Sequence, residues 1–151
     1  MSSSGTCLVA VDGSEASVQA LVWGFRHATD RDLAVEVLTV WPPHRSVLIH
    51  EVPGHFCAAR WSARAAQEDA IRQALDEVPE ASTSAVRLEN AETADAIVRA
   101  SAGCDLVVLG SDPNDSTHGL TDRIIEQALC EVVVVAGSGE VVRSRVCASS
   151  R

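Results

Sequence analysis

Short apolar runs alternate with amphipathic stretches along most of the chain. A run that is apolar on both faces is what a buried parallel strand requires, whereas apolar residues that recur every three or four positions indicate a helix. Five strands are predicted, the third from a less continuous run: Cys7–Val11, Ala34–Val40, Ser84–Leu88, Leu106–Leu109 and Val132–Val135. Four helices are predicted between them from the apolar stripes within Val18–Ala28, Ala58–Val78, Ala94–Ser101 and Leu120–Ala128.

This alternation predicts an α/β fold with one five-stranded parallel sheet and helices on both faces. Parallel strands joined by helices require right-handed crossovers, which place the helices over the sheet. Ligands of such sheets bind beyond the carboxyl ends of the strands, where the strand order reverses. The ends to examine are Val11-Asp12, Val40-Trp41 and Leu109-Gly110.

The chain of 151 residues is expected to form one domain over residues 6–136, because this length supplies a single core. Residues 1–5 are expected to be a disordered N-terminus, and residues 137–151 a frayed or loosely docked C-terminal tail. The segment Pro42–Cys57 contains three prolines and three histidines without a helical or strand period, so we expect a loop there.

The net charge of -9, from 21 acidic and 12 basic residues, argues against nucleic-acid binding. Every basic residue is arginine, which excludes lysine-dependent chemistry such as a P-loop lysine or a Schiff base. No apolar run approaches the roughly 20 residues of a membrane helix. The N-terminus carries no basic residue of a signal peptide, so a cytoplasmic location is expected.

The five cysteines include no C-x-x-C pair and are expected to be reduced thiols rather than disulfides. His44, His50, His55 and Cys57 share one loop, but their spacing does not match a zinc motif, so no metal site is predicted. No G-x-S-x-G element is present, and no catalytic residue is predicted.

Four motifs resemble those of universal stress proteins, in the same order and spacing over residues 6–136. The segment Val9–Ser17 is similar to the opening V-x-V-D-G-S-x-x-S of that family. The later segments Ala94–Val98, Cys104–Ser111 and Cys130–Val135 are similar to its A-x-x-I helix, its D-L-V-V-x-G-S strand and its closing C-P-V-V-V-V. The resemblance implies the strand order 3-2-1-4-5 of Rossmann-like, adenine nucleotide alpha hydrolase-like domains.

The resemblance also implies where a nucleotide would bind. Asp12 and Val40 would lie on the adenosine side, and Leu109, Gly110 and Ser111 would begin the loop that wraps ribose and phosphates. Glycines in that loop let backbone N–H groups approach phosphate oxygens. An alternative for Asp12 is that its carboxylate only shapes the turn by accepting backbone hydrogen bonds.

The phosphate loop departs from the family pattern. No G-x-x-G follows Ser111, and alignment back from Cys130 places His118, Gly119 and Thr121 where the family has its G-S-V-S/T. Asp112 and Asp115 add two carboxylates, each costing on the order of 1–4 kcal/mol beside a phosphate. We therefore expect a degenerate site that binds ATP weakly or not at all. An alternative interpretation is that this loop is a turn followed by a helix cap, which requires no ligand.

The sequence thus predicts a universal stress protein-like regulatory or binding protein in stress response. One alternative is a genuine ATP-binding member with slow hydrolysis, in which Mg²⁺ held by Asp112 or Asp115, or a hydrogen bond from His118, offsets the repulsion. A second is an enzyme related to ATP-pyrophosphatases or electron-transfer flavoprotein domains, which rests on fold analogy alone.

The last predicted strand bears on assembly. In the order 3-2-1-4-5, Val132, Val133, Val134 and Val135 lie at a sheet edge, and an exposed β-branched edge favours pairing with another chain. The family resemblance implies a two-fold homodimer through this strand, with other protein partners unidentified. The competing interpretation is that Val141–Val146 folds back and covers the edge within one chain.

Overall fold

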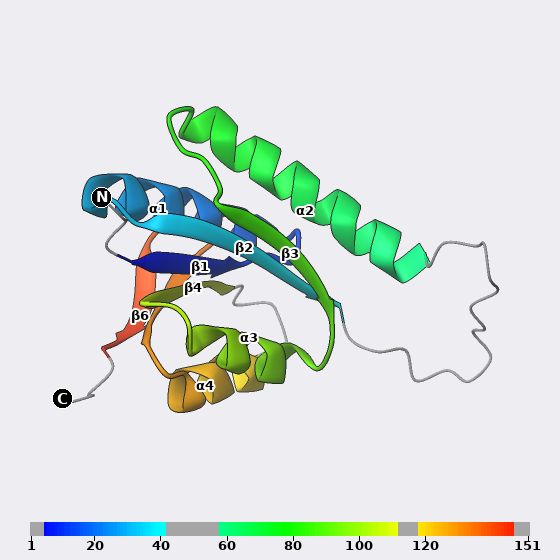
Figure 1. Ribbon diagram of the computed structural model, residues 1–151, viewed down its shortest axis with the longest axis vertical. Helices are drawn as coiled ribbons and strands as arrows, with labels where there is room; N and C mark the ends of the chain where they lie inside the picture. Colours follow the sequence, from blue (N-terminus) through cyan, green and yellow to red (C-terminus); the bar gives the residue numbers. More distant parts are fainter. Residues whose placement is uncertain (1–4, 42–57, 112–117, 147–151) are drawn as a thin grey trace.

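The structure is a computed structural model that describes residues 5–41, 58–111 and 118–146 (Figure 1). Its elements alternate between strands and helices until the last pair of strands. In chain order they are β1 Thr6–Ala10, α1 Glu15–Arg31, β2 Ala34–Trp41, α2 Ala58–Glu77, β3 Ala85–Asn90, α3 Thr93–Ser101, β4 Leu106–Ser111, α4 His118–Gln127, β5 Glu131–Ala136 and β6 Val141–Arg145. The loop predicted over 42–57 and the expected N-terminal residues 1–4 lie outside the described ranges.

The strands form one sheet in the order β3-β2-β1-β4-β5-β6. The first five are parallel, which confirms the α/β class and the order 3-2-1-4-5. At the centre, Val9 of β1 stands opposite Val37 of β2 and Val108 of β4, and all three are fully buried. The prediction of five strands is wrong, because a sixth strand completes the sheet.

The sixth strand, β6, lies within the segment expected to be a tail and runs antiparallel to β5. A tight turn makes this possible, because Ala136 donates its N–H to Glu140 O (2.8 Å) and Gly139 adopts a φ of +94°. The premise that Val132–Val135 form an open edge is therefore wrong, since β6 occupies that edge. The competing interpretation, in which the chain folds back on itself, is confirmed for Val141–Arg145.

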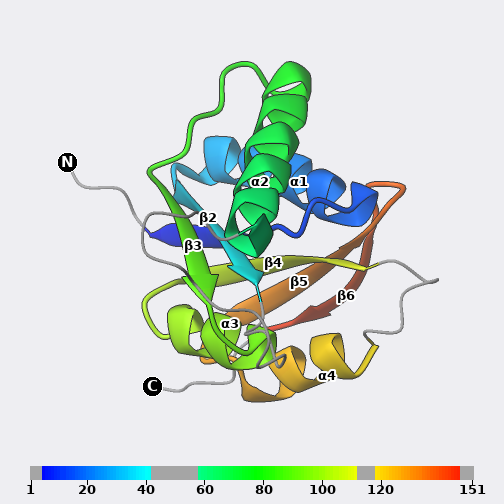
Figure 2. The same cartoon turned by 90° about the vertical axis from the view of Figure 1, so that its right-hand side faces the viewer.

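Side chains of the sheet alternate between two cores. Cys7 and Val9 face α1 and α2, whereas Leu8 faces α3 and α4. Figure 2 shows α1 and α2 on one side of the sheet and α3 and α4 on the other. Both faces of the central strands are covered, which explains why their sequences are apolar at consecutive positions. None of the helices in the described ranges is both long and apolar enough to cross a membrane.

Candidate functional site

A cavity of about 90 Å³ opens at the carboxyl ends of β1, β2 and β4 and is bounded by α3 and α4. This is the position where the reversal of strand order from β1 to β4 predicts a ligand. Its apolar walls comprise Ala10, Val11, Leu38, Val40, Ile97, Leu109, Leu120 and Ile124. Its polar lining side chains are Asp12, Ser14, Ser17, Thr93 and Thr121. Apolar walls with a few polar groups are typical of small-molecule sites, whose volumes are usually larger, roughly 300–1,000 Å³.

The turn between β1 and α1 and the first turn of that helix supply three of the polar residues. Asp12 Oδ1 accepts the N–H of Ser14 at 2.9 Å, and Ser14 Oγ accepts the N–H of Ser17 at 3.2 Å as the N-cap of α1. Ser17 Oγ in turn donates to Ser14 O at 2.9 Å. Gly13 has a φ of +90°, a conformation that disfavours other residues. The turn is thus held by its own hydrogen bonds and presents Asp12 at the cavity.

Asp12 carries a negative charge at neutral pH. Partial burial favours the neutral acid, but the hydrogen bonds from Ser14 and Ser17 outweigh it and lower the pKa of Asp12 below its ordinary 3.8. An ionised carboxylate accepts hydrogen bonds and repels other anions. The cavity mouth therefore favours a ligand that brings hydroxyl groups to this position.

Gly110 lets the end of β4 approach the first turn of α1. A Cβ at this residue would lie 2.5 Å from the carbonyl carbon of Ala16 and 2.6 Å from the backbone nitrogen of Ser17. Backbone atoms of a helix cannot yield easily, so only glycine fits. Gly110 shapes the wall of the cavity beside Leu109, which is buried.

The structure brings together most of the residues singled out from the sequence. Asp12, Val40, Leu109, Gly110 and Thr121 all line the cavity. Two others, Ser111 and Gly119, are not among its described lining residues. His118 begins α4, but its side chain, like Asp112 and Asp115, is outside the described part of the chain.

Sequence reasoning missed the contribution of α3. Thr93 and Ile97 line the cavity from this helix. Ile97 belongs to the apolar stripe of α3 that packs on the sheet, and the same residue also forms part of the cavity wall. The start of the third helix could have pointed to Thr93, its first residue after the N-cap Glu92, because helices that follow parallel strands begin at the ligand edge of the sheet.

Three cysteines lie outside the cavity in the described part of the chain. Cys7, Cys104 and Cys130 are thiols and not disulfides. Burial, with smaller contributions from Cys104 and Cys130, raises the pKa of Cys7 to about 12, so its reactive thiolate is not populated at neutral pH. Within the described ranges, no three His, Cys, Asp or Glu side chains are placed to hold a metal ion. The histidines of the loop 42–57 lie outside those ranges.

Solved structures of universal stress proteins are similar to this chain. A family protein from Burkholderia pseudomallei is 23% identical, with a TM-score of 0.60 over 86% of this chain and 94% of that chain. A universal stress protein in complex with cAMP is 17% identical, with a TM-score of 0.65 over 89% and 98%. A family protein from Arabidopsis thaliana with AMP bound is 18% identical, with a TM-score of 0.57 over 87% and 90%.

At these identities the structural likeness shows the fold, and the family assignment comes from the sequence. No match was found among curated proteins. The model of the universal stress protein family, however, matches residues 4–136 and so spans all the parallel strands and the four helices. The chain belongs to the universal stress protein family.

Proposed function

We propose that the protein is a regulatory protein of the stress response that binds the adenosine part of an adenine nucleotide and holds polyphosphate weakly or not at all. The observation that carries this proposal is the cavity at the carboxyl ends of β1, β2 and β4, with apolar walls and an ionised Asp12 at its mouth. The similar structures with cAMP and with AMP are consistent with a nucleoside monophosphate as ligand.

The chemistry of the lining suits a nucleoside. Leu38, Val40 and Leu109 offer apolar surface to the flat faces of a purine. The carboxylate of Asp12 can accept hydrogen bonds from ribose hydroxyl groups, which are donors, but not from phosphate oxygens. Each unscreened contact between this charge and a phosphate costs on the order of 1–4 kcal/mol. Affinity should therefore fall as phosphates are added.

The experiment is calorimetric titration with adenosine, AMP and ATP, with Mg²⁺ present and absent. We expect adenosine and AMP to bind, and ATP to bind at least tenfold more weakly than AMP. Asp12→Ala should weaken adenosine binding by about tenfold or more, because it removes a charged acceptor. The matched control is Glu15→Ala, since Glu15 is an exposed carboxylate in the first turn of α1 that does not line the cavity. Failure of both adenosine and AMP to bind would contradict the proposal.

The alternative of a genuine ATP-binding protein with slow hydrolysis makes the opposite predictions. Mg²⁺ held by Asp112 or Asp115 would strengthen ATP binding, and the double variant Asp112→Gly with Asp115→Gly would weaken it. If these carboxylates repel phosphate, the same double variant should strengthen ATP binding instead. The sign of the change separates the two functions.

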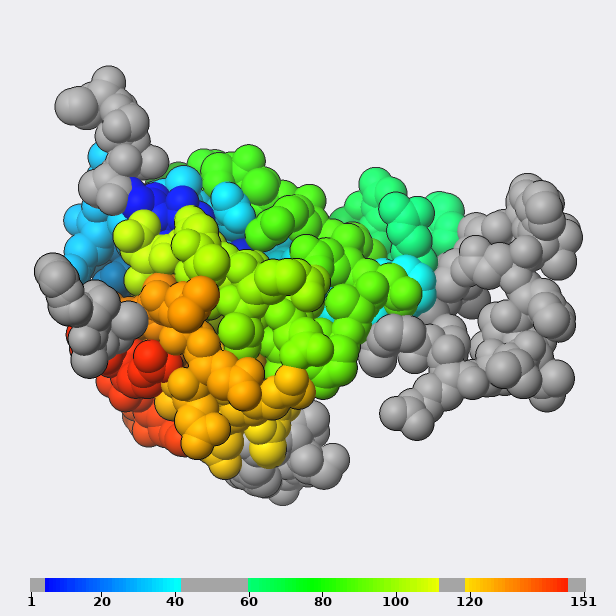
Figure 3. Space-filling model, turned by 60° about the horizontal axis from the view of Figure 1, so that its bottom comes forward, coloured from blue at the N-terminus to red at the C-terminus, as the bar shows by residue number. Residues whose placement is uncertain are grey.

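We also propose that the protein is a homodimer, with β6 rather than β5 at its interface. β6 lies at the edge of the described sheet, and Val141 and Val142 are 44% and 52% exposed on it. Figure 3 shows the surfaces of α4 and β6 side by side, which agrees with the ion pair between Arg143 and Asp122. A two-fold pairing of β6 with its copy would satisfy the outward backbone groups of both strands.

A further inference from the structure

The width of the cavity depends on the spacing of two helices. α3 supplies Thr93 and Ile97 to the wall, and α4 supplies Leu120, Thr121 and Ile124. Each helix follows a parallel strand, so both N-terminal ends lie at the ligand edge of the sheet and both C-terminal ends lie at the opposite edge. The two helices are joined by buried contacts at the far end and by exposed ion pairs at the mouth of the cavity.

At the far end the helices are joined by buried contacts. Ser101 is fully buried at the end of α3, and its Oγ accepts the N–H of Leu129, just beyond α4, at 3.0 Å. Ile97 of α3 packs in the same core as Ile124 and Ala128 of α4. Buried hydrogen bonds and apolar packing are little affected by salt, so the spacing of α3 and α4 at this end should not change with ionic strength.

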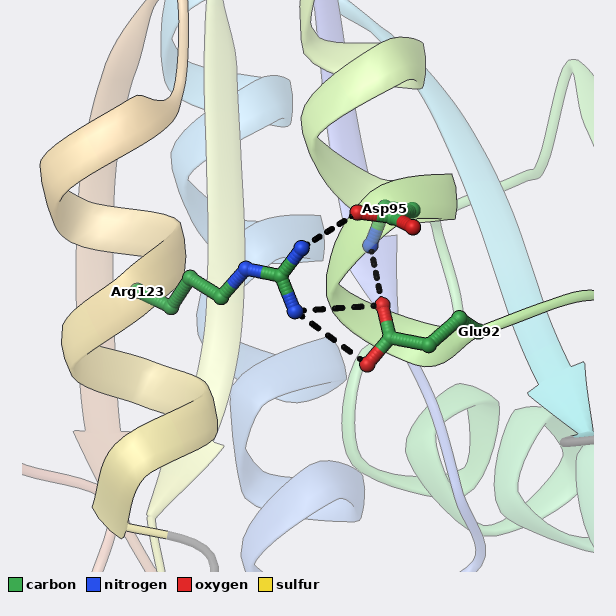
Figure 4. A network of polar contacts seen from close by, with 3 residues as sticks. All are labelled: Glu92, Asp95 and Arg123. Carbon is green, nitrogen blue, oxygen red and sulfur yellow. Dashed lines mark hydrogen bonds and ion pairs between the residues drawn. The ribbon is translucent and has the colours of Figure 1, made fainter.

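At the mouth the helices are joined by charges in contact with water. Arg123 of α4 donates from Nη1 to both carboxylate oxygens of Glu92 at 3.3 Å, and from Nη2 to Asp95 Oδ1 at 2.5 Å (Figure 4). Glu92 is also the N-cap of α3, accepting the N–H of Asp95 at 2.9 Å. The side chains of Arg123, Glu92 and Asp95 are 40%, 55% and 53% exposed.

We propose that Arg123 is a positioning residue that clamps the N-terminal end of α3 against α4 and so fixes the width of the nucleotide cavity. Thr93 lines the cavity and lies between the two carboxylates that Arg123 holds, so movement of the first turn of α3 moves the wall directly. Without the guanidinium, Glu92 and Asp95 would be two adjacent negative charges that repel each other. This inference rests on the proposed nucleoside site.

The clamp predicts that the affinity for a neutral ligand depends on salt, an effect that the charge of the ligand cannot produce. Adenosine is neutral, so its own contact with the protein is nearly independent of ionic strength. Exposed ion pairs weaken when salt screens them. If the clamp sets the cavity, adenosine affinity must fall as salt is raised, and that dependence must disappear when Arg123 is replaced.

The test compares Arg123→Gln with Arg99→Gln in calorimetric titrations with adenosine and with AMP at low and high salt. Arg99 is the matched control, because it lies in the last turn of α3 and pairs with Glu89 of β3 (3.2 Å), so its replacement leaves the contact between α3 and α4 intact. At low salt we expect Arg123→Gln to weaken both ligands by about three- to tenfold, as for a small network of exposed pairs. Wild type should approach the variant at high salt, and Arg123→Lys should recover part of the loss.

Two results would overturn the clamp. Unchanged affinity in Arg123→Gln means that the spacing does not depend on this residue. A loss confined to AMP means that Arg123 acts as a counter-charge to the phosphate and not as a clamp.

Hydrogen exchange tests the clamp without a ligand. In Arg123→Gln, the amides of Asp95 and Ala96, which are bonded to the side chain and the carbonyl of Glu92, should exchange faster than in wild type, while the Leu129 amide bonded to Ser101 should not change. Equal exchange in the two proteins contradicts the clamp. If wild type binds neither adenosine nor AMP, the proposed function fails, and this measurement still decides whether Arg123 holds the two helices together.

Discussion

At the scale of single residues, Gly110 shows how closely the cavity wall packs on α1. The variant Gly110→Ala is expected to lower the free energy of unfolding by about 1–3 kcal/mol, because its Cβ would overlap the backbone of Ala16 and Ser17. Chemical denaturation measures this change. Gly103→Ala is the control, since a Cβ there meets no atom within 4 Å, and an equal loss in both variants would contradict the overlap.

Asp12 links the same turn to pH. Because its pKa is lowered on folding, the unfolded chain takes up a proton near pH 3.8 while the folded chain does not. The stability that Asp12 contributes is therefore complete above that pH and is lost as the pH falls through the lower pKa of the folded state.

The prediction for Asp12 is a difference between two unfolding curves. Asp12→Asn should be less stable than wild type near neutral pH, and the difference in unfolding free energy should shrink as the pH falls below about 3.8. Denaturation at a series of pH values from acid to neutral measures it. A difference that stays constant with pH would mean that the charge of Asp12 does not contribute.

At the scale of elements, the strands that could be predicted are those whose burial is evident from the apolar residues of their own sequence. β1, β4 and β5 are apolar at successive positions because helices cover both of their faces. β6 reads Val-Val-Arg-Ser-Arg and is mostly exposed, so no local period marks it. Its formation depends on a partner strand and on contacts with α4, which are properties of the folded chain.

The residues of the candidate site could also be predicted only in part. Asp12, Val40 and Leu109 stand at ends of strands that the apolar pattern located, so their convergence followed from topology. Thr93 follows β3, whose interrupted apolar run gave only an approximate end. The face of α3 that lines the cavity depends on the spacing between α3 and α4. The pattern of apolar residues along the sequence carries no information about that spacing.

Arg145 is expected to be the main anchor of β6. Its guanidinium donates to Ile125 O and, at 3.2 Å, to Ala128 O, two carbonyl groups at the C-terminal end of α4. Arg145→Ala should lower the unfolding free energy by about 1.5–3 kcal/mol and speed hydrogen exchange in β6. Arg143→Ala, which removes only the exposed pair with Asp122, should cost less than about 1 kcal/mol. Equal effects would contradict the assignment.

At the scale of the whole molecule, the two edges of the sheet allow a test of the proposed dimer. Val142 on β6 and Val86 on β3 are 52% and 46% exposed, so a charge at either position should leave folding largely intact. Val142→Lys is expected to convert a dimer into a monomer, whereas Val86→Lys should not. Light scattering coupled to size-exclusion chromatography distinguishes these states. A dimer that survives Val142→Lys, or dissociates with Val86→Lys, would place the interface elsewhere.

The pairing of β6 with the edge of β5 also affects aggregation. Four consecutive valines without charge or proline, as in Val132–Val135, are the kind of segment that stacks into cross-β fibrils when its edge is free. β6 satisfies that edge and carries two arginines next to it, which makes it an intramolecular gatekeeper. Cleavage in the turn at 137–140 followed by dissociation of β6 would therefore do more than remove a surface strand, because it would expose a strand edge that can template fibril growth.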